Sequence, residues 1–343
     1  MTGSPASPTA VPPAFAVAVP AAPVDLRPLT TSELIDRGFA LYRAHFAGFL
    51  LLALLSQSAP LLGQIIVTAF KLNPTQEELL ETPADFFSKM GVLTGISLIT
   101  QVIVFCFDVV MTFYIADAYL GKIPSVKDSL RRFTPRFLAS VWTCILNRIL
   151  IGITALFPIV TVTAVYLYAL SYPPATFLSL ITLSSVAFLL LVGSFAPVLI
   201  VFMRRLMLTV PALALEGHSG WSAVKRSAAL VRYDPGLGIL YWGEMRLSFL
   251  LLPLFVIECL ILFLTSLPVT IHHLGELIQH GSTGQITPPP DSVLILSQIL
   301  TFLAGSLILP LYSIAITLFY YDTRIRREGF DIEFLAGQLK GRS

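Results

Sequence analysis

The chain has 343 residues, of which 55% are hydrophobic and only 12% are charged, and its mean hydropathy is +0.81. A water-soluble domain of this size does not tolerate so apolar a surface, so the composition excludes a soluble globular protein and predicts a chain that uses lipid as its solvent. The net charge of +2 at pH 7 is too small to indicate nucleic acid as a partner.

Residues 1–28 form a tail rich in proline and alanine, which we expect to be disordered because its prolines prevent a helix. No basic residue precedes Arg27, so the tail lacks the charged start of a signal peptide. Residues 29–335 are predicted to form a transmembrane domain, and residues 336–343 a C-terminal tail.

Six segments are long and apolar enough to cross a bilayer core about 30 Å thick, which requires roughly 20 residues in a helix. The fold class we predict is therefore an all-α membrane protein with six transmembrane helices. The third and fourth segments are separated by the turn Ser171–Pro174. The segments are Ala47–Phe70, Met90–Asp117, the two halves of Ile149–Met203, Gly238–Leu267 and Ser292–Tyr321.

Lysine and arginine are distributed by membrane side. They gather before the first span, between spans two and three, between spans four and five, and after span six, whereas the alternate loops contain only Lys71 and Lys89. Cytoplasmic loops carry the excess of basic residues, so this pattern predicts that both termini lie in the cytoplasm.

An amphipathic segment precedes spans one, three and five, and it suggests three pseudo-repeats of about 31–121, 122–218 and 219–330. Each unit would comprise an interfacial helix and a transmembrane hairpin. The alternative is a chance match between common entry helices. Positions i, i+4, i+7 and i+11 are Ile35, Phe39, Tyr42 and Phe46; Val126, Leu130, Phe133 and Phe137; and Val224, Ala228, Val231 and Pro235.

The opposite faces of these segments are basic, which favours contact with the anionic head groups of membrane lipids at the cytoplasmic surface, or with a protein partner. The candidate residues for this lipid or partner face are Arg37, Arg43, Lys127, Arg131, Arg132, Lys225 and Arg226.

Four stretches resemble the membrane domain found next to some bacterial glycerophosphoryl diester phosphodiesterases and in many stand-alone membrane proteins. They are Glu33–Phe46, Val210–Gly217, Ala223–Leu230 and Tyr320–Glu333. The resemblance implies a protein of a bacterial plasma membrane. It implies no activity, because that activity belongs to a separate soluble barrel with His-Arg and Glu-Asn motifs.

The chain contains no His-Arg or Glu-Asn pair, so we expect no enzymatic activity and no cofactor. Cys106, Cys144 and Cys259 lie in apolar runs, where we expect neither disulfides nor metal ligation. His272 and His273 are assigned to the outer loop and, as neighbours, are a poor pair for one metal ion, so no metal site is predicted.

Ionisable residues at membrane depth form a candidate polar network, because each costs roughly 2.5 to 3.5 kcal/mol at a helix centre on insertion scales. The arginines either snorkel at the inner interface or form pairs with the acids. Such pairs would either fix the helix register or line a path for an ion or substrate. The residues are Asp108, Arg148, Glu244, Arg246 and Glu258.

The C-terminal run alternates in sign where span six leaves the membrane. The spacing predicts i,i+4 pairs of Asp322 with Arg326 and of Arg324 with Glu328. The remaining acids either dock against the basic interfacial helices or belong to a solvated helix end.

The functional hypothesis that follows is a non-enzymatic membrane protein whose interfacial helices hold anionic lipid or a partner against the bundle. The alternative is a transporter or channel for a small or lipid-like substrate, suggested by proline-interrupted spans and buried charges.

Overall fold

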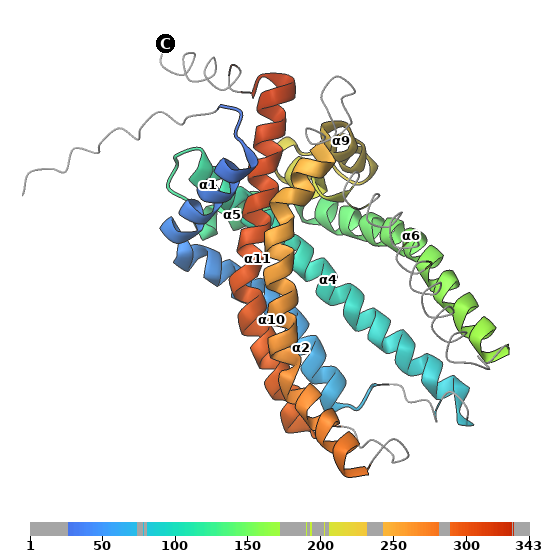
Figure 1. Cartoon of the computed structure of the whole chain (residues 1–343). Coiled ribbons are helices and arrows are strands. Elements are labelled where there is room, and N and C mark those ends of the chain that lie inside the picture. Colours follow the sequence, from blue (N-terminus) through green and yellow to red (C-terminus); the bar gives the residue numbers. More distant parts are fainter. Residues whose placement is uncertain are drawn as a thin grey trace, which may run out of the picture.

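The computed structural model of the chain describes residues 27–73, 81–171, 206–231, 243–280 and 289–330, with a few isolated residues between and after them. Every regular element in these ranges is a helix (Figure 1). The predicted N-terminal tail up to residue 26, the C-terminal tail 336–343 and nearly all of the fourth predicted span lie outside the described residues.

Five of the described helices are long and apolar enough to cross a membrane. They coincide with predicted spans one, two, three, five and six, so the chain has the features of a membrane-embedded protein. The helices are α2 (Phe46–Ala69), α4 (Pro83–Tyr119), α6 (Phe137–Ser171), α10 (Gly243–His280) and α11 (Asp291–Glu328).

Several of these helices extend beyond the predicted apolar spans. Helix α4 begins at Pro83 instead of Met90, because proline suits the first helical position and Asp85 complements the positive helix end. Helix α10 runs on to His280, so the assignment of His272 and His273 to a loop was wrong. The predicted bounds came from hydropathy, which marks only the segment that lipid can cover. The helix itself continues as long as its backbone hydrogen bonds can form.

Short helices occupy the three predicted amphipathic segments. They are α1 (Thr31–Ala44), α5 (Val126–Phe133), which continues into the 3-10 turn η1 (Thr134–Arg136), and α9 (Trp221–Val231). Helix α1 starts with a capping box, in which Thr30 Oγ1 accepts from the Glu33 N–H at 3.3 Å and the Glu33 carboxylate accepts from the Thr30 N–H at 2.7 Å. Since the second span of the middle repeat lies outside the described residues, the threefold repeat stays a prediction.

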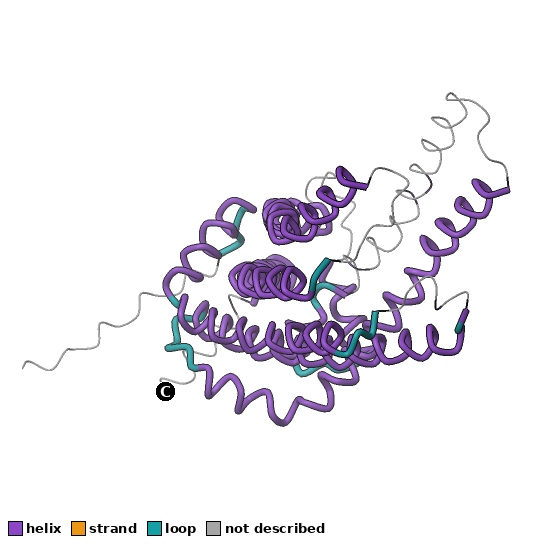
Figure 2. The backbone as a smooth tube through the Cα atoms, turned by 90° about the horizontal axis from the view of Figure 1, so that it is seen from below, coloured by secondary structure: helices purple, strands orange, loops and turns teal. Residues whose placement is uncertain are grey.

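Helix α11 lies at the centre of the bundle and packs against α1, α2, α4 and α10 (Figures 1 and 2). Helix α4 connects this group to α5 and α6, and α6 diverges from α10 and α11 toward the lower end of Figure 1. We call the opposite end of the bundle, where Tyr320–Glu328 of α11 meets α9, the segment before α1 and the end of α4 that packs on α5, the charged end. Buried side chains concentrate near it, in Val109–Ala116, Leu318–Tyr321, Leu213, Ala214, Leu230 and Val231.

Candidate functional site at the charged end

Asp322 of α11 connects three parts of the chain. Its side chain is 0% exposed, and its Oδ1 accepts a hydrogen bond from the backbone N–H of Leu29 at 2.8 Å. Its Oδ2 accepts from Arg246 of α10 and from Arg326, each at 2.9 Å. The same two guanidinium groups donate to the Leu29 carbonyl at 3.0 and 2.6 Å. The segment before α1 is thereby attached to both long C-terminal helices.

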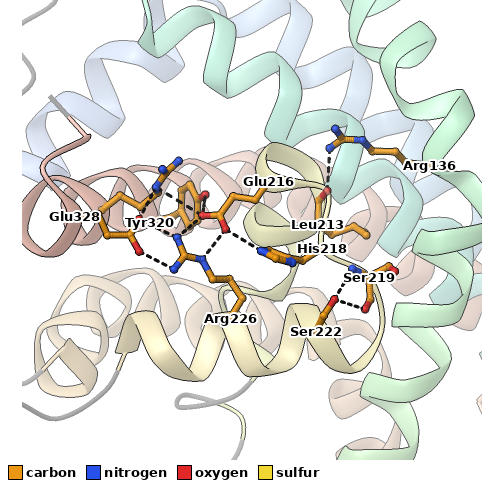
Figure 3. A network of polar contacts seen from close by, with 10 residues as sticks. Arg136, Leu213, Glu216, His218, Ser219, Ser222, Arg226, Tyr320 and Glu328 are labelled. Atoms are coloured by element: carbon orange, nitrogen blue, oxygen red, sulfur yellow. Dashed lines mark hydrogen bonds and ion pairs between the residues drawn. The ribbon is translucent and has the colours of Figure 1, made fainter. Parts of the chain in front are cut away.

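A second network centres on Glu216 (Figure 3). Its carboxylate accepts from Arg226 of α9 at 2.5 and 2.8 Å and from the Tyr320 hydroxyl at 2.5 Å. Arg226 also forms an ion pair with Glu328 at 2.6 Å, and Arg324 lies between Glu328 at 3.0 Å and Glu216 at 3.6 Å. These five side chains join α9 to the end of α11.

The backbone around Glu216 explains how the carboxylate reaches this position. Glu216 ends the π-helical turn η3 (Ala212–Glu216), which follows the short turn α8 (Thr209–Pro211). Gly217 follows with φ of +79°, a left-handed conformation that glycine adopts without steric cost. Arg136 donates to the carbonyls of Leu213 (2.9 Å) and Ala214, which holds the turn against η1.

The charges around Glu216 fix its ionisation state. Burial by itself would raise the pKa of Glu216, but hydrogen bonds from Arg226 and Tyr320 and the positive charges of Arg226 and Arg324 outweigh it, so the pKa lies below its ordinary value. Hydrogen bonds from Arg226 to Glu216 and Glu328 likewise raise the pKa of that guanidinium. Both groups are therefore charged at neutral pH.

A third ion pair joins α4 to α5. Arg132 binds the carboxylate of Asp117 through its two terminal nitrogens, Nη1 and Nη2. Its guanidinium carbon lies 5.2 Å from the centre of the Phe113 ring. Arg136 lies over the same ring at 5.4 Å. Phe113 therefore packs beneath two cations where α4 ends.

The seven residues of the predicted lipid or partner face differ in exposure and in partners. Arg132 and Arg226 are engaged within the protein by Asp117 and by Glu216, and so are not free to hold a ligand. Arg37 is half-buried on α1. The other four are exposed, and no ion pair to them occurs among the described residues: Arg43, Lys127, Arg131 and Lys225.

The predicted pairing of Asp108 and Glu258 with Arg148 and Arg246 is not what the structure contains. Arg246 binds Asp322, whereas Glu258 accepts from the Tyr312 hydroxyl at 2.7 Å. Arg246 and Glu258 lie on one helix, twelve residues and therefore about 18 Å apart, too far to meet.

The remaining intramembrane residues are also placed differently. Arg148 donates to the side chain of Gln101 on α4. It forms no ion pair with Asp108, whose Oδ1 is buried without a hydrogen-bond partner, although the positive charge of Arg148 acts on that carboxyl group. Glu244 belongs to α10, but its side chain lies outside the described residues. The predicted set is thus divided among separate contacts and does not form one network.

The two predicted i,i+4 pairs at the end of α11 are present, whereas the remaining acids, Asp331 and Glu333, lie outside the described residues. Asp322 pairs with Arg326 and Arg324 with Glu328, both at i,i+4, and Glu328 docks on Arg226 of α9. The sequence analysis missed Glu216 and Asp117. Their signals were present, since Glu216 directly precedes Gly217 in the Val210–Gly217 stretch and Asp117 is the acid at the end of the second span.

Comparison of the chain with protein-family models, with curated proteins and with solved structures finds no match. The ion pairs inside the charged end have both partners within the protein and hold the helices together. The exposed cations of this end are available to anions.

Proposed function

We propose that the chain is a non-enzymatic, multi-pass protein of a bacterial plasma membrane that holds anionic lipid head groups at its charged end. The observation that carries the proposal is the set of four exposed cations on α1, α5 and α9, namely Arg43, Lys127, Arg131 and Lys225. A basic residue near the surface of an anionic leaflet contributes about 1 kcal/mol of attraction.

Apolar side chains accompany these cations, as lipid binding requires. Leu130 is exposed between Lys127 and Arg131 on α5, and Ile123 in the preceding loop is 95% exposed. Such side chains suit the acyl boundary when cations on the same surface meet head groups. Trp142 (58% exposed) and Trp221 (45% exposed) add the aromatic residues that favour a membrane interface.

The proposal includes six transmembrane helices with both termini in the cytoplasm, which would put the charged end at the inner leaflet. The basic loops support this orientation. The resemblance of Val210–Gly217 and Tyr320–Glu333 to the phosphodiesterase-associated membrane domain supports the bacterial assignment. A protein partner is the other occupant that this face would accommodate.

The test is lipid retention by the double variant K127E/R131E. Purified protein in native mass spectrometry should retain roughly thirtyfold less phosphatidylglycerol than wild type, because the two cations together contribute about 2 kcal/mol. Arg132 is left unchanged, because reversing its charge would break the ion pair with Asp117 and disturb the fold.

The matched control compares two single charge reversals, Lys127→Glu on α5 and Lys71→Glu at the other end of α2. Only the first should lower phosphatidylglycerol retention, and neither should change retention of zwitterionic phosphatidylethanolamine. Equal retention by wild type and the double variant would disprove the lipid assignment.

A further inference from the structure

A partly open cavity with a mixed polar and apolar lining lies between α2 and α11, away from the charged end. Its volume is about 230 Å³, and its polar lining consists of Gln57, Gln64, Ser297, Gln298 and Thr301. Both helices are candidate membrane spans, and they run side by side in Figures 1 and 2. That volume is several times what a single water molecule requires.

The cavity lies at membrane depth. Gln57 is eleven residues from the start of α2 at Phe46, or about 16 Å along the helix, and Thr301 is ten residues from the start of α11 at Asp291, or about 15 Å. Polar side chains in the hydrocarbon region are costly and usually face a hydrated interior. Pro60, which also lines the cavity, interrupts the hydrogen bonding of α2 at this level.

The hydroxyl groups that line the cavity donate their hydrogen bonds to backbone carbonyls of the protein. Ser297 Oγ donates to the Thr265 carbonyl at 2.8 Å, and Thr301 Oγ1 donates to the Ser297 carbonyl at 2.9 Å. The side-chain nitrogen of Gln298 donates to Thr68 Oγ1 at 2.9 Å, and its Oε1 is buried without a partner. The hydroxyl oxygens of Ser297 and Thr301 and the amide oxygen of Gln298 therefore keep lone pairs that can accept, and a matching ligand must donate hydrogen bonds.

The lining also defines the charge of the ligand. None of the residues around this cavity is ionisable, so an ion bound here would find no opposite charge at a depth where unpaired charge is expensive. Gln57 and Gln64 each provide an amide with two donor hydrogens and an acceptor oxygen. A hydroxyl group both donates and accepts, and so complements the amides and the lone pairs.

We propose that the cavity between α2 and α11 is a water-filled binding site for a small, uncharged solute rich in hydroxyl groups, of the polyol class. This site is separate from the lipid face, because its residues come from the middle of α2 and the first half of α11 and not from α1, α5 or α9.

The test uses cysteine accessibility in lipid nanodiscs, where both membrane faces meet the solvent. In a background with Cys106, Cys144 and Cys259 replaced by alanine, Thr301→Cys should react with the cationic thiol reagent aminoethyl methanethiosulfonate. The matched control is Leu300→Cys, an exposed neighbour on α11 at the same depth that does not line the cavity. Only thiolate in contact with water reacts readily, so we expect at least a roughly tenfold difference in rate.

Glycerol is the probe for the ligand class. It should slow the labelling of Thr301→Cys by roughly twofold or more when it occupies the acceptor sites, beyond its effect on Lys127→Cys, which is exposed on α5. Ser297→Cys provides a second cavity position should Thr301→Cys fail to fold. Equal rates at the cavity positions and Leu300→Cys would overturn the water-filled site, and equal slowing at the cavity positions and Lys127→Cys would overturn the polyol assignment.

Discussion

Asp322 and Asp108 are both carboxylates within long apolar helices, but their surroundings have opposite energetic consequences. Asp322 is surrounded by two guanidinium groups and a backbone N–H, whereas Asp108 Oδ1 has no hydrogen-bond partner. Removing one member of a buried pair leaves the others uncompensated. At Asp108 the cost of burial exceeds the attraction of Arg148, so neutralising that carboxylate relieves a cost.

We expect Asp322→Asn to lower the free energy of unfolding by about 3 kcal/mol, because Arg246 and Arg326 lose their shared counter-charge. Asp108→Asn should leave the thermal midpoint unchanged or raise it. Thermal unfolding of both variants in the same detergent measures the contrast. A loss for Asp108→Asn as large as that for Asp322→Asn would mean that Asp108 has a partner that stabilises its charge.

At this scale the sequence predicts local partners well and distant ones poorly. The pairs of Asp322 with Arg326 and of Arg324 with Glu328 follow from helical spacing alone, because residues four apart lie on one face. The contacts of Arg246 with Asp322 and of Arg226 with Glu216 depend on how separate elements rotate and pack. No spacing rule contains that information.

At the scale of elements, Glu216 links the turn η3 to α9 and α11, and this link depends on pH. Because the folded pKa of Glu216 is below its ordinary value of about 4.3, its stabilising contribution is present above that value and is lost as pH falls through the folded pKa. Protonation removes the negative charge between Arg226 and Arg324 and weakens the attachment of α9 to α11, which then depends on Glu328.

We predict that wild type loses thermal stability as pH falls from about 5 toward 3, and that Glu216→Gln, already less stable at pH 7, loses less over the same range. Thermal unfolding at pH 7, 5, 4 and 3 measures both slopes. Other carboxylates titrate in both proteins, so the difference between the slopes reports Glu216. Parallel slopes would show that Glu216 does not hold this end of the bundle.

The identity of the elements was more predictable than their ends. Apolar periodicity located α1, α5 and α9, and hydropathy located the five long helices. The extension of α10 to His280 was missed, because a helix needs only backbone hydrogen bonds to continue and lipid is not required beyond the span. The π-helical turn η3 was also missed, since no composition rule marks it.

At the scale of the whole molecule, burial is concentrated near the charged end. The most apolar window of each candidate span is no more than 39% buried inside the protein, whereas Met111, Ile115 and Tyr320 are almost fully buried near the charged end. Apolar helix surface of this extent suits contact with lipid, and the packed end positions α1, α5 and α9 around the end of α11.

The charge bias of the loops leads to a prediction about orientation. Cysteines replacing Lys127 on α5 and Lys225 on α9 should react with a membrane-impermeant maleimide from the same side of sealed vesicles, and a cysteine replacing Lys71 should react from the other side. Opened vesicles, in which all three react, provide the control. Reaction of positions 127 and 225 from opposite sides would contradict the proposed topology.

The attachment of Leu29 to Asp322 also affects how the protein is made. The two residues are separated by 293 positions, so at roughly 5 to 20 residues per second the ribosome takes roughly 15 to 60 s to reach the acid after making its partner. Throughout that interval the start of α1 lacks its attachment to Asp322. Nascent chains that stall before position 322 would therefore leave the segment at Leu29 unattached, where membrane proteases can recognise it.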